Sequence, residues 1–124
     1  MRVGIFLLLA GLWTSSALAA NLKPGPSETD YLFQCSATFI INAHELKDSG
    51  KSPKIKTKAA EYESRFKTLA ARAEASFEEH RRSRAEALAY LQKHVDTMSV
   101  MFANEPEVMK RFLQQCDTRY PDVH

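Results

Sequence analysis

The chain has 124 residues, and its 17 lysines and arginines stand against 15 acidic residues, so the formal net charge is only +2. Apolar residues make up 44% and charged residues 26%, which is typical of a folded globular domain. This length and balance exclude a multidomain enzyme, a polytopic membrane protein and a strongly basic nucleic-acid-binding protein, and they fit a single domain.

Residues 1–20 have the layout of a secretory signal peptide. The start carries one positive charge at Arg2, an apolar run of about ten residues follows, and small side chains stand at Ala17 and Ala19. A membrane-spanning helix needs about 20 apolar residues, roughly twice the length of this run. We therefore predict cleavage after Ala19 or Ala20, no stable membrane insertion afterwards, and a periplasmic or secreted protein.

The remainder is predicted to be a loop at 21–26 followed by a single helical domain at 27–124. The first helix begins at Ser27, which forms a capping box with Asp30, and ends at Gly50. Apolar residues recur along it at spacings of three and four, which indicates a buried face. The residues of this stripe are Leu32, Cys35, Phe39, Ala43 and Leu46.

The second helix begins with Ser52 as its cap and Pro53 as its first residue, and it carries the most regular apolar stripe of the chain. Its lysines, glutamates and arginines are expected on the opposite face, in solvent. Residues 54–105 contain no Gly or Pro, but one helix of that length would be about 78 Å long, too long for a compact chain. The segment therefore either breaks or belongs to one long helix in an extended coiled coil. We predict a break at Ser83, which forms a second capping box with Glu86. The stripe consists of Ile55, Ala59, Tyr62, Phe66, Leu69, Ala73 and Phe77.

The third helix is expected from Ser83 to Phe102. The fourth begins at Asn104 as its cap, has Pro106 in its first turn, and ends before Pro121. Four helices with short connections predict an all-α fold, a small antiparallel four-helix bundle. The inward residues are Leu88, Leu91, Val95, Met98 and Phe102 in the third helix, and Val108, Met109, Phe112, Leu113 and Cys116 in the fourth.

Cys35 and Cys116 are the only cysteines, so one intramolecular pairing is available. Export to an oxidising compartment favours a disulfide, and the absence of a Cys-x-x-Cys motif argues against thiol exchange. In an up-down-up-down bundle the start of the first helix and the end of the fourth share one end. The sequence therefore predicts one disulfide that links these two helices.

Motifs for chemistry are missing from the sequence. It contains no Gly-x-Ser-x-Gly elbow, no Gly-rich phosphate loop, no Cys-x-x-Cys-His haem attachment and no Glu-x-x-His pair. We predict no enzyme activity, no cofactor, and no catalytic, cofactor-binding or metal-binding residues. The histidines are interpreted as surface side chains; they are His44, His80, His94 and His124.

Basic residues gather at the two ends of the second helix. One interpretation is that both groups belong to solvated loops. The other is a weak contact with an anionic surface of the cell envelope or with an acidic partner, since nucleic acid is not expected after export. The candidate contact residues are Lys51, Lys54, Lys56, Lys58, Arg81, Arg82 and Arg84.

These observations lead to two functional hypotheses. The first is an exported, non-catalytic protein that acts by contact with an unidentified protein partner, in an accessory, chaperone-like, inhibitor or immunity role. The alternative is a bundle that carries a small apolar ligand or haem between the first and third helices.

Overall fold

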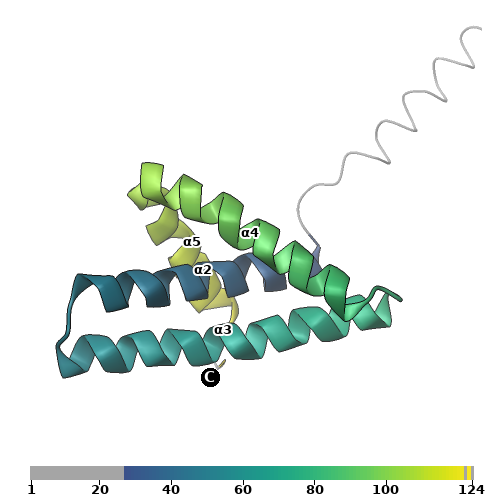
Figure 1. The fold of residues 1–124 in the computed structure, drawn as a ribbon, viewed down its shortest axis with the longest axis horizontal. Coiled ribbons are helices and arrows are strands. Elements are labelled where there is room, and N and C mark those ends of the chain that lie inside the picture. Colours follow the sequence, from purple (N-terminus) through teal and green to yellow (C-terminus); the bar gives the residue numbers. More distant parts are fainter. Residues whose placement is uncertain (1–26, 122, 124) are drawn as a thin grey trace, which may run out of the picture.

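The computed structural model describes residues 27–121 and 123, and this part of the chain contains four helices and no strand (Figure 1). The helices are α2 (Glu28–Ser49), α3 (Pro53–Glu79), α4 (Arg84–Asn104) and α5 (Pro106–Arg119). They form the predicted all-α bundle, in which α2 and α3 are an antiparallel hairpin. The predicted signal peptide at 1–20 and the loop at 21–26 lie outside the described residues.

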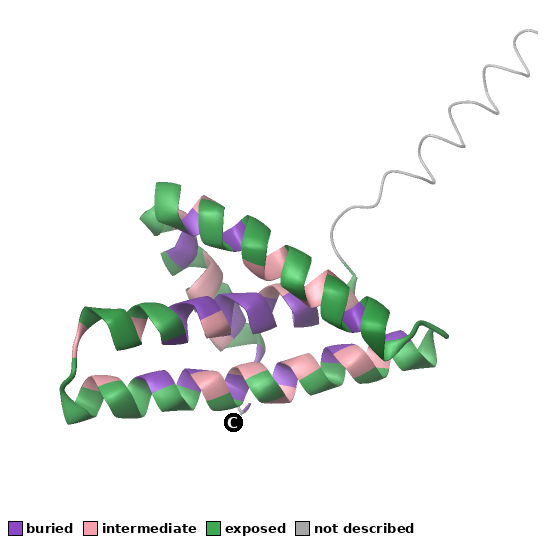
Figure 2. Cartoon of the chain, in the orientation of Figure 1, coloured by how far each residue is buried: buried purple, intermediate pink, exposed green. Residues whose placement is uncertain are grey.

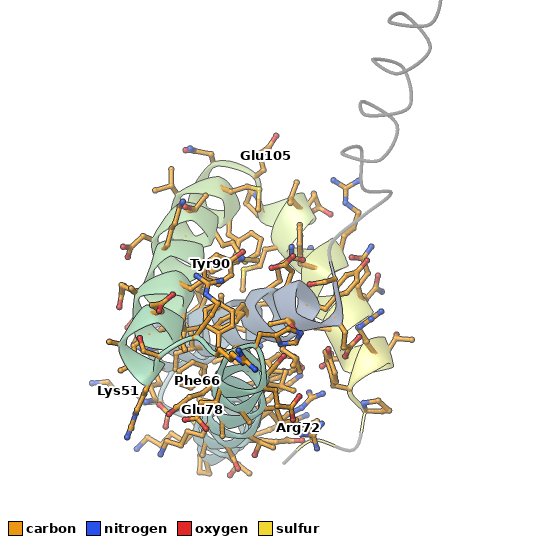
Figure 3. All side chains as sticks on the ribbon, turned by 90° about the vertical axis from the view of Figure 1, so that its right-hand side faces the viewer. Lys51, Phe66, Arg72, Glu78, Tyr90 and Glu105 are labelled. Carbon is orange, nitrogen blue, oxygen red and sulfur yellow. A yellow bond between two sulfur atoms is a disulfide. The ribbon has the colours of Figure 1, made fainter. Side chains whose placement is uncertain are left out.

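Helix α2 is the central element and packs on each of the other three helices. A view along the α2–α3 hairpin shows α4 and α5 on opposite sides of α2 (Figure 3). Most residues of α2 from Leu32 to Ala43 are consequently buried, including the polar Ser36 and Thr38. Both hydroxyls donate a hydrogen bond to the carbonyl four residues earlier, at 2.6 Å from Ser36 and 2.8 Å from Thr38, so their burial leaves no polar atom unpaired.

The break between α3 and α4 is confirmed, and local interactions explain it in the absence of Gly or Pro. Arg81 adopts the left-handed conformation with φ of 61°, and the Arg82 N–H donates to the Phe77 carbonyl at 2.8 Å, which closes the end of α3. The Arg82 guanidinium lies 4.0 Å from the centre of the Phe77 ring. The capping box of Ser83 and Glu86 then starts α4.

The start of the last helix differs from the prediction. Asn104 is the final residue of α4 and not the cap of α5, and Glu105 alone connects the two helices. The Glu105 N–H still donates to the Met101 carbonyl at 2.9 Å, so the helical hydrogen bonding continues up to Pro106. Pro106 has no N–H and disfavours a helical conformation in the residue before it, which places the break at Glu105.

The core follows the predicted stripes except in the first half of α4 (Figure 2). Leu88 was predicted to face inward, but it is 52% exposed. Helix α4 diverges from α3 as it leaves their connection (Figure 1), so its buried residues are Ala87, Met98 and Phe102. In α3, Phe66 lies at the edge of the core and is only partly buried.

Arg65 is buried, although the sequence places the arginines of α3 in solvent. Its Nη1 donates to Asp117 at 2.6 Å. Its Nη2 donates to the Tyr120 carbonyl at 2.9 Å and its Nε to the Val123 carbonyl at 3.1 Å. The guanidinium also lies 4.3 Å from the centre of the Phe39 ring. Arg65 therefore joins α3 to the end of α5 and supplies donors to the irregular segment that follows.

Candidate functional site

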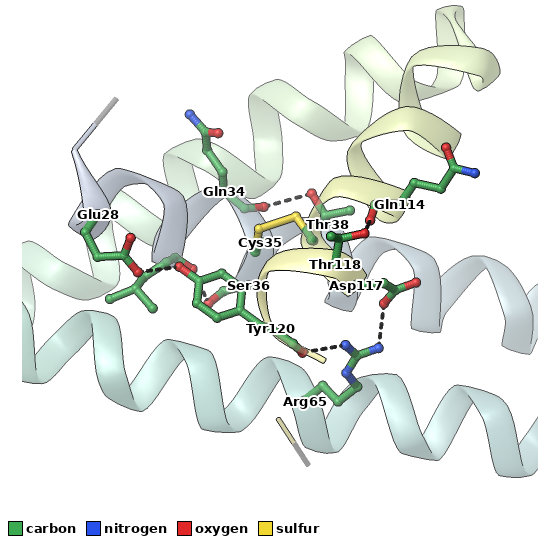
Figure 4. The surroundings of a disulfide bond; sticks show 12 residues. Glu28, Gln34, Cys35, Ser36, Thr38, Arg65, Gln114, Asp117, Thr118 and Tyr120 are labelled. Atoms are coloured by element: carbon green, nitrogen blue, oxygen red, sulfur yellow. Dashed lines mark hydrogen bonds and ion pairs between the residues drawn. A yellow bond between two sulfur atoms is a disulfide. The ribbon is translucent and has the colours of Figure 1, made fainter. Parts of the chain in front are cut away.

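The predicted disulfide is present and ties α2 to α5 (Figure 4). Cys35 and Cys116 are both buried, and their Cα atoms are 5.4 Å apart. Nearby, Arg119 forms an ion pair with Glu28, and the Tyr120 hydroxyl donates to the same carboxylate at 2.9 Å. The start of α2 and the last turn of α5 are therefore in contact, as the predicted disulfide requires, although the chain after α5 lies beside Arg65 in the middle of α3.

These contacts shift the pKa of two side chains, Glu28 and Tyr120. Burial alone would raise the pKa of the Glu28 carboxyl, but hydrogen bonds from Arg119 and Tyr120 outweigh it and hold that pKa below its ordinary value. Burial, reinforced by the hydrogen bond to Glu28, raises the pKa of the Tyr120 hydroxyl. Glu28, Arg119 and Tyr120 thus connect the start of α2 to the end of α5 by an ion pair and a hydrogen bond.

A groove of about 690 Å³ lies between α2 and α5 where the disulfide joins them. We call it the α2–α5 groove. Its volume falls within the roughly 300–1,000 Å³ that is typical of binding sites, although it is open to solvent. The disulfide fixes the two walls relative to each other. The lining residues are Tyr31, Gln34, Cys35, Phe112, Gln114, Gln115, Cys116, Thr118 and Arg119.

The groove offers neutral hydrogen-bonding groups beside apolar surface. Its one charged residue is Arg119, which is engaged by Glu28 and lies 3.8 Å from the centre of the Tyr31 ring. The side-chain amides of Gln34, Gln114 and Gln115 have no hydrogen-bond partner among the described residues. Each amide carries both donors and an acceptor. The groove can therefore bind an uncharged segment that itself presents donors and acceptors.

No sequence pattern predicts this grouping of glutamines. Gln34 stands 80 positions before Gln114 in the numbering, and glutamine is a common residue on exposed helix surfaces. Gln114 and Gln115 are exposed on α5, and Gln34 is partly exposed on α2. Only the crossing of these two helices brings the three amides to one groove.

The predicted lysine contacts share one end of the molecule. Lys51 belongs to the connection between α2 and α3, and Lys54, Lys56 and Lys58 stand in the first two turns of α3. All four side chains are exposed. None of them forms an ion pair within residues 27–121 and 123.

The predicted arginine contacts lie at the opposite end of α3, about 40 Å away for a helix of 27 residues. Arg82 pairs with Glu86 at 3.0 Å, and Arg84 pairs with Glu74 at 3.1 Å. The hydrogen bond from Arg82 lowers the pKa of Glu86. Two of the three arginines thus have internal partners, Arg81 remains exposed, and the arginines and lysines form no common surface.

Two of the histidines line separate hollows beside α4. His44 shares a hollow of about 260 Å³ between α2 and α4 with Glu45 and Asp48. His94 lines another of about 230 Å³ and packs on the Tyr90 ring, with the ring centres 4.6 Å apart. Within the described residues, no three His, Cys, Asp or Glu side chains are grouped so that they could hold a metal ion.

None of the described helices α2 to α5 combines the length and the apolar character that a bilayer-spanning helix needs. Comparison of the chain with protein-family models, with curated proteins and with solved structures finds no match.

Proposed function

We propose that this is an exported, non-catalytic protein of the periplasm or the extracellular space that binds a segment of a partner protein in the α2–α5 groove. The observation that supports this proposal is the set of three unpartnered amides of Gln34, Gln114 and Gln115 around one groove. A polypeptide backbone presents N–H donors and C=O acceptors in alternation, and a glutamine amide complements both. Because the one charged lining residue, Arg119, is already paired with Glu28, the groove favours an uncharged stretch of the partner.

The rigidity of the groove supports a binding role. A preformed site loses little conformational entropy when its ligand arrives, which increases affinity. Here the disulfide fixes α2 against α5 directly below the site, and the contacts of Glu28 with Arg119 and Tyr120 fix the neighbouring helix ends. The lining contains no carboxylate and no histidine, which suits binding better than acid–base chemistry.

The carrier alternative places an apolar ligand or haem between α2 and α4. The hollow there has a volume of about 260 Å³ and is bordered by the charged side chains of Glu45 and Asp48. Neither property favours an apolar cargo, so we retain protein binding as the proposal.

Site-specific cross-linking tests the groove directly. A photoreactive residue is placed at Gln115, in the groove, or at Ala75, exposed on α3, and adducts formed in the producing cells are identified by mass spectrometry. The cross-linked segment is then synthesised, and its binding to the purified protein is measured by fluorescence anisotropy.

We expect one partner segment to be captured from Gln115 and not from Ala75. Gln115→Glu should weaken binding of the synthetic peptide at least about tenfold, equal to 1.4 kcal/mol, while Ala75→Glu leaves it unchanged. Equal capture from both positions, no adduct from Gln115, or unchanged affinity in Gln115→Glu would each refute the proposal.

A further inference from the structure

The turn between α2 and α3 holds the largest group of basic side chains without an ion pair in the described part of the chain. Residues 49–60 contain four lysines and no acidic residue. We call Lys51, Lys54, Lys56 and Lys58 the lysine tip. By contrast, Lys47, just before the tip, forms an ion pair with Glu63 on α3. None of the four tip lysines forms an ion pair within the described residues, and the nearest carboxylates in the sequence, Asp48 and Glu61, stand just outside the tip.

The local structure intensifies this charge. The N-terminal end of a helix carries a partial positive charge, and α3 has no acidic residue in its first turn to offset it. Lys54 and Lys58 are four residues apart, so they lie on one face of α3 and repel each other. The arrangement is unfavourable for the isolated protein, and an anionic surface would relieve it.

The shape of the tip indicates what kind of surface it fits. The hairpin end projects beyond α4 and α5 (Figures 1 and 2), and almost every side chain from residue 44 to residue 58 is exposed. Lys54 and Lys58 share one side of α3, and Lys56 faces the opposite side. The positive charge is therefore spread around the end of the helix. A projecting end with charge around it can meet a flat surface without interference from the rest of the molecule.

We propose that the lysine tip docks the protein end-on to the anionic headgroups of a phospholipid bilayer. Basic side chains near such a surface each strengthen binding about fivefold, and the attraction is screened by salt. In this orientation the arginine end of α3 stands about 40 Å from the bilayer. The α2–α5 groove contains none of the tip lysines and remains free for its partner.

Vesicle sedimentation with the protein in its exported form tests this proposal. The vesicles contain phosphatidylglycerol and phosphatidylcholine, or phosphatidylcholine alone, at about 0.01 M and about 0.15 M salt. In the test variant all four tip lysines are replaced by glutamine. The matched control removes the same number of charges from exposed positions elsewhere: Lys67→Gln, Arg72→Gln, Lys93→Gln and Arg111→Gln. Circular dichroism verifies that both variants are folded.

The native protein should bind the phosphatidylglycerol vesicles at low salt, with less binding at higher salt and little on phosphatidylcholine. The tip variant should lose affinity several hundredfold, whereas the control, whose four charges lie away from the bilayer, should lose less than about fivefold in total. Absence of binding to phosphatidylglycerol at low salt would overturn the proposal and direct attention to an acidic protein or polymer. An equal loss in both variants would overturn it too, because net charge and not the tip would then be responsible.

Discussion

Replacement of Arg65 by methionine tests how the end of the chain is held on the bundle. The substitution preserves most of the apolar stem but removes all three hydrogen bonds to α5 and the segment after it. The Asp117 side chain is 40% exposed, so water can replace its lost partner. The carbonyls of Tyr120 and Val123 lose charged donors in a buried setting, at roughly 1.5–3 kcal/mol each.

We therefore expect Arg65→Met to lower the free energy of unfolding by about 3–5 kcal/mol, a large share of the roughly 5–15 kcal/mol of a small domain. The melting temperature should fall by at least about 12 °C, measured by circular dichroism with urea unfolding in parallel. Arg72→Met, at an exposed position on the same helix, should change stability by less than about 0.5 kcal/mol. If the two variants melt alike, the anchoring role of Arg65 is wrong.

Three further changes test other parts of the fold. The double variant Cys35→Ala/Cys116→Ala should lose about 4–5 kcal/mol of its free energy of unfolding, measured in urea, because the disulfide closes a loop of about 80 residues. Equal stability of the oxidised and the reduced native protein would contradict this. Arg81→Gly should stabilise the protein by roughly 0.5–1 kcal/mol, because glycine adopts the left-handed conformation of this position without steric strain. A loss of stability would show that Arg81 is not strained there. Because the pKa of Glu28 is lowered on folding, its contribution is present at neutral pH and is lost as the pH falls below the ordinary glutamate value of 4.5 and through the lowered pKa. Glu28→Gln should therefore flatten the dependence of the free energy of unfolding on pH in that range. If the variant and the native protein lose stability equally with falling pH, the Glu28 carboxylate does not contribute to stability.

Helix starts and stops could be predicted because their causes are local. Ser27 with Asp30 and Ser83 with Glu86 form the predicted capping boxes within four residues of chain. The one cap that failed, at Asn104, was also decided locally, since Pro106 enforced the break one residue later than expected. The disulfide followed from the presence of just two cysteines and from the way an antiparallel bundle brings its first and last helices together.

The apolar stripes fixed which face of each helix turns inward, but not how the helices cross. Crossing angles depend on the interlocking of side chains from two helices, and neither sequence pattern contains that information alone. The divergence of α4 from α3 exposes Leu88, and the return of the chain after α5 buries Arg65 beneath backbone carbonyls that need donors. The α2–α5 groove has the same origin: three glutamines without any periodic signal converge because a disulfide holds two crossing helices together.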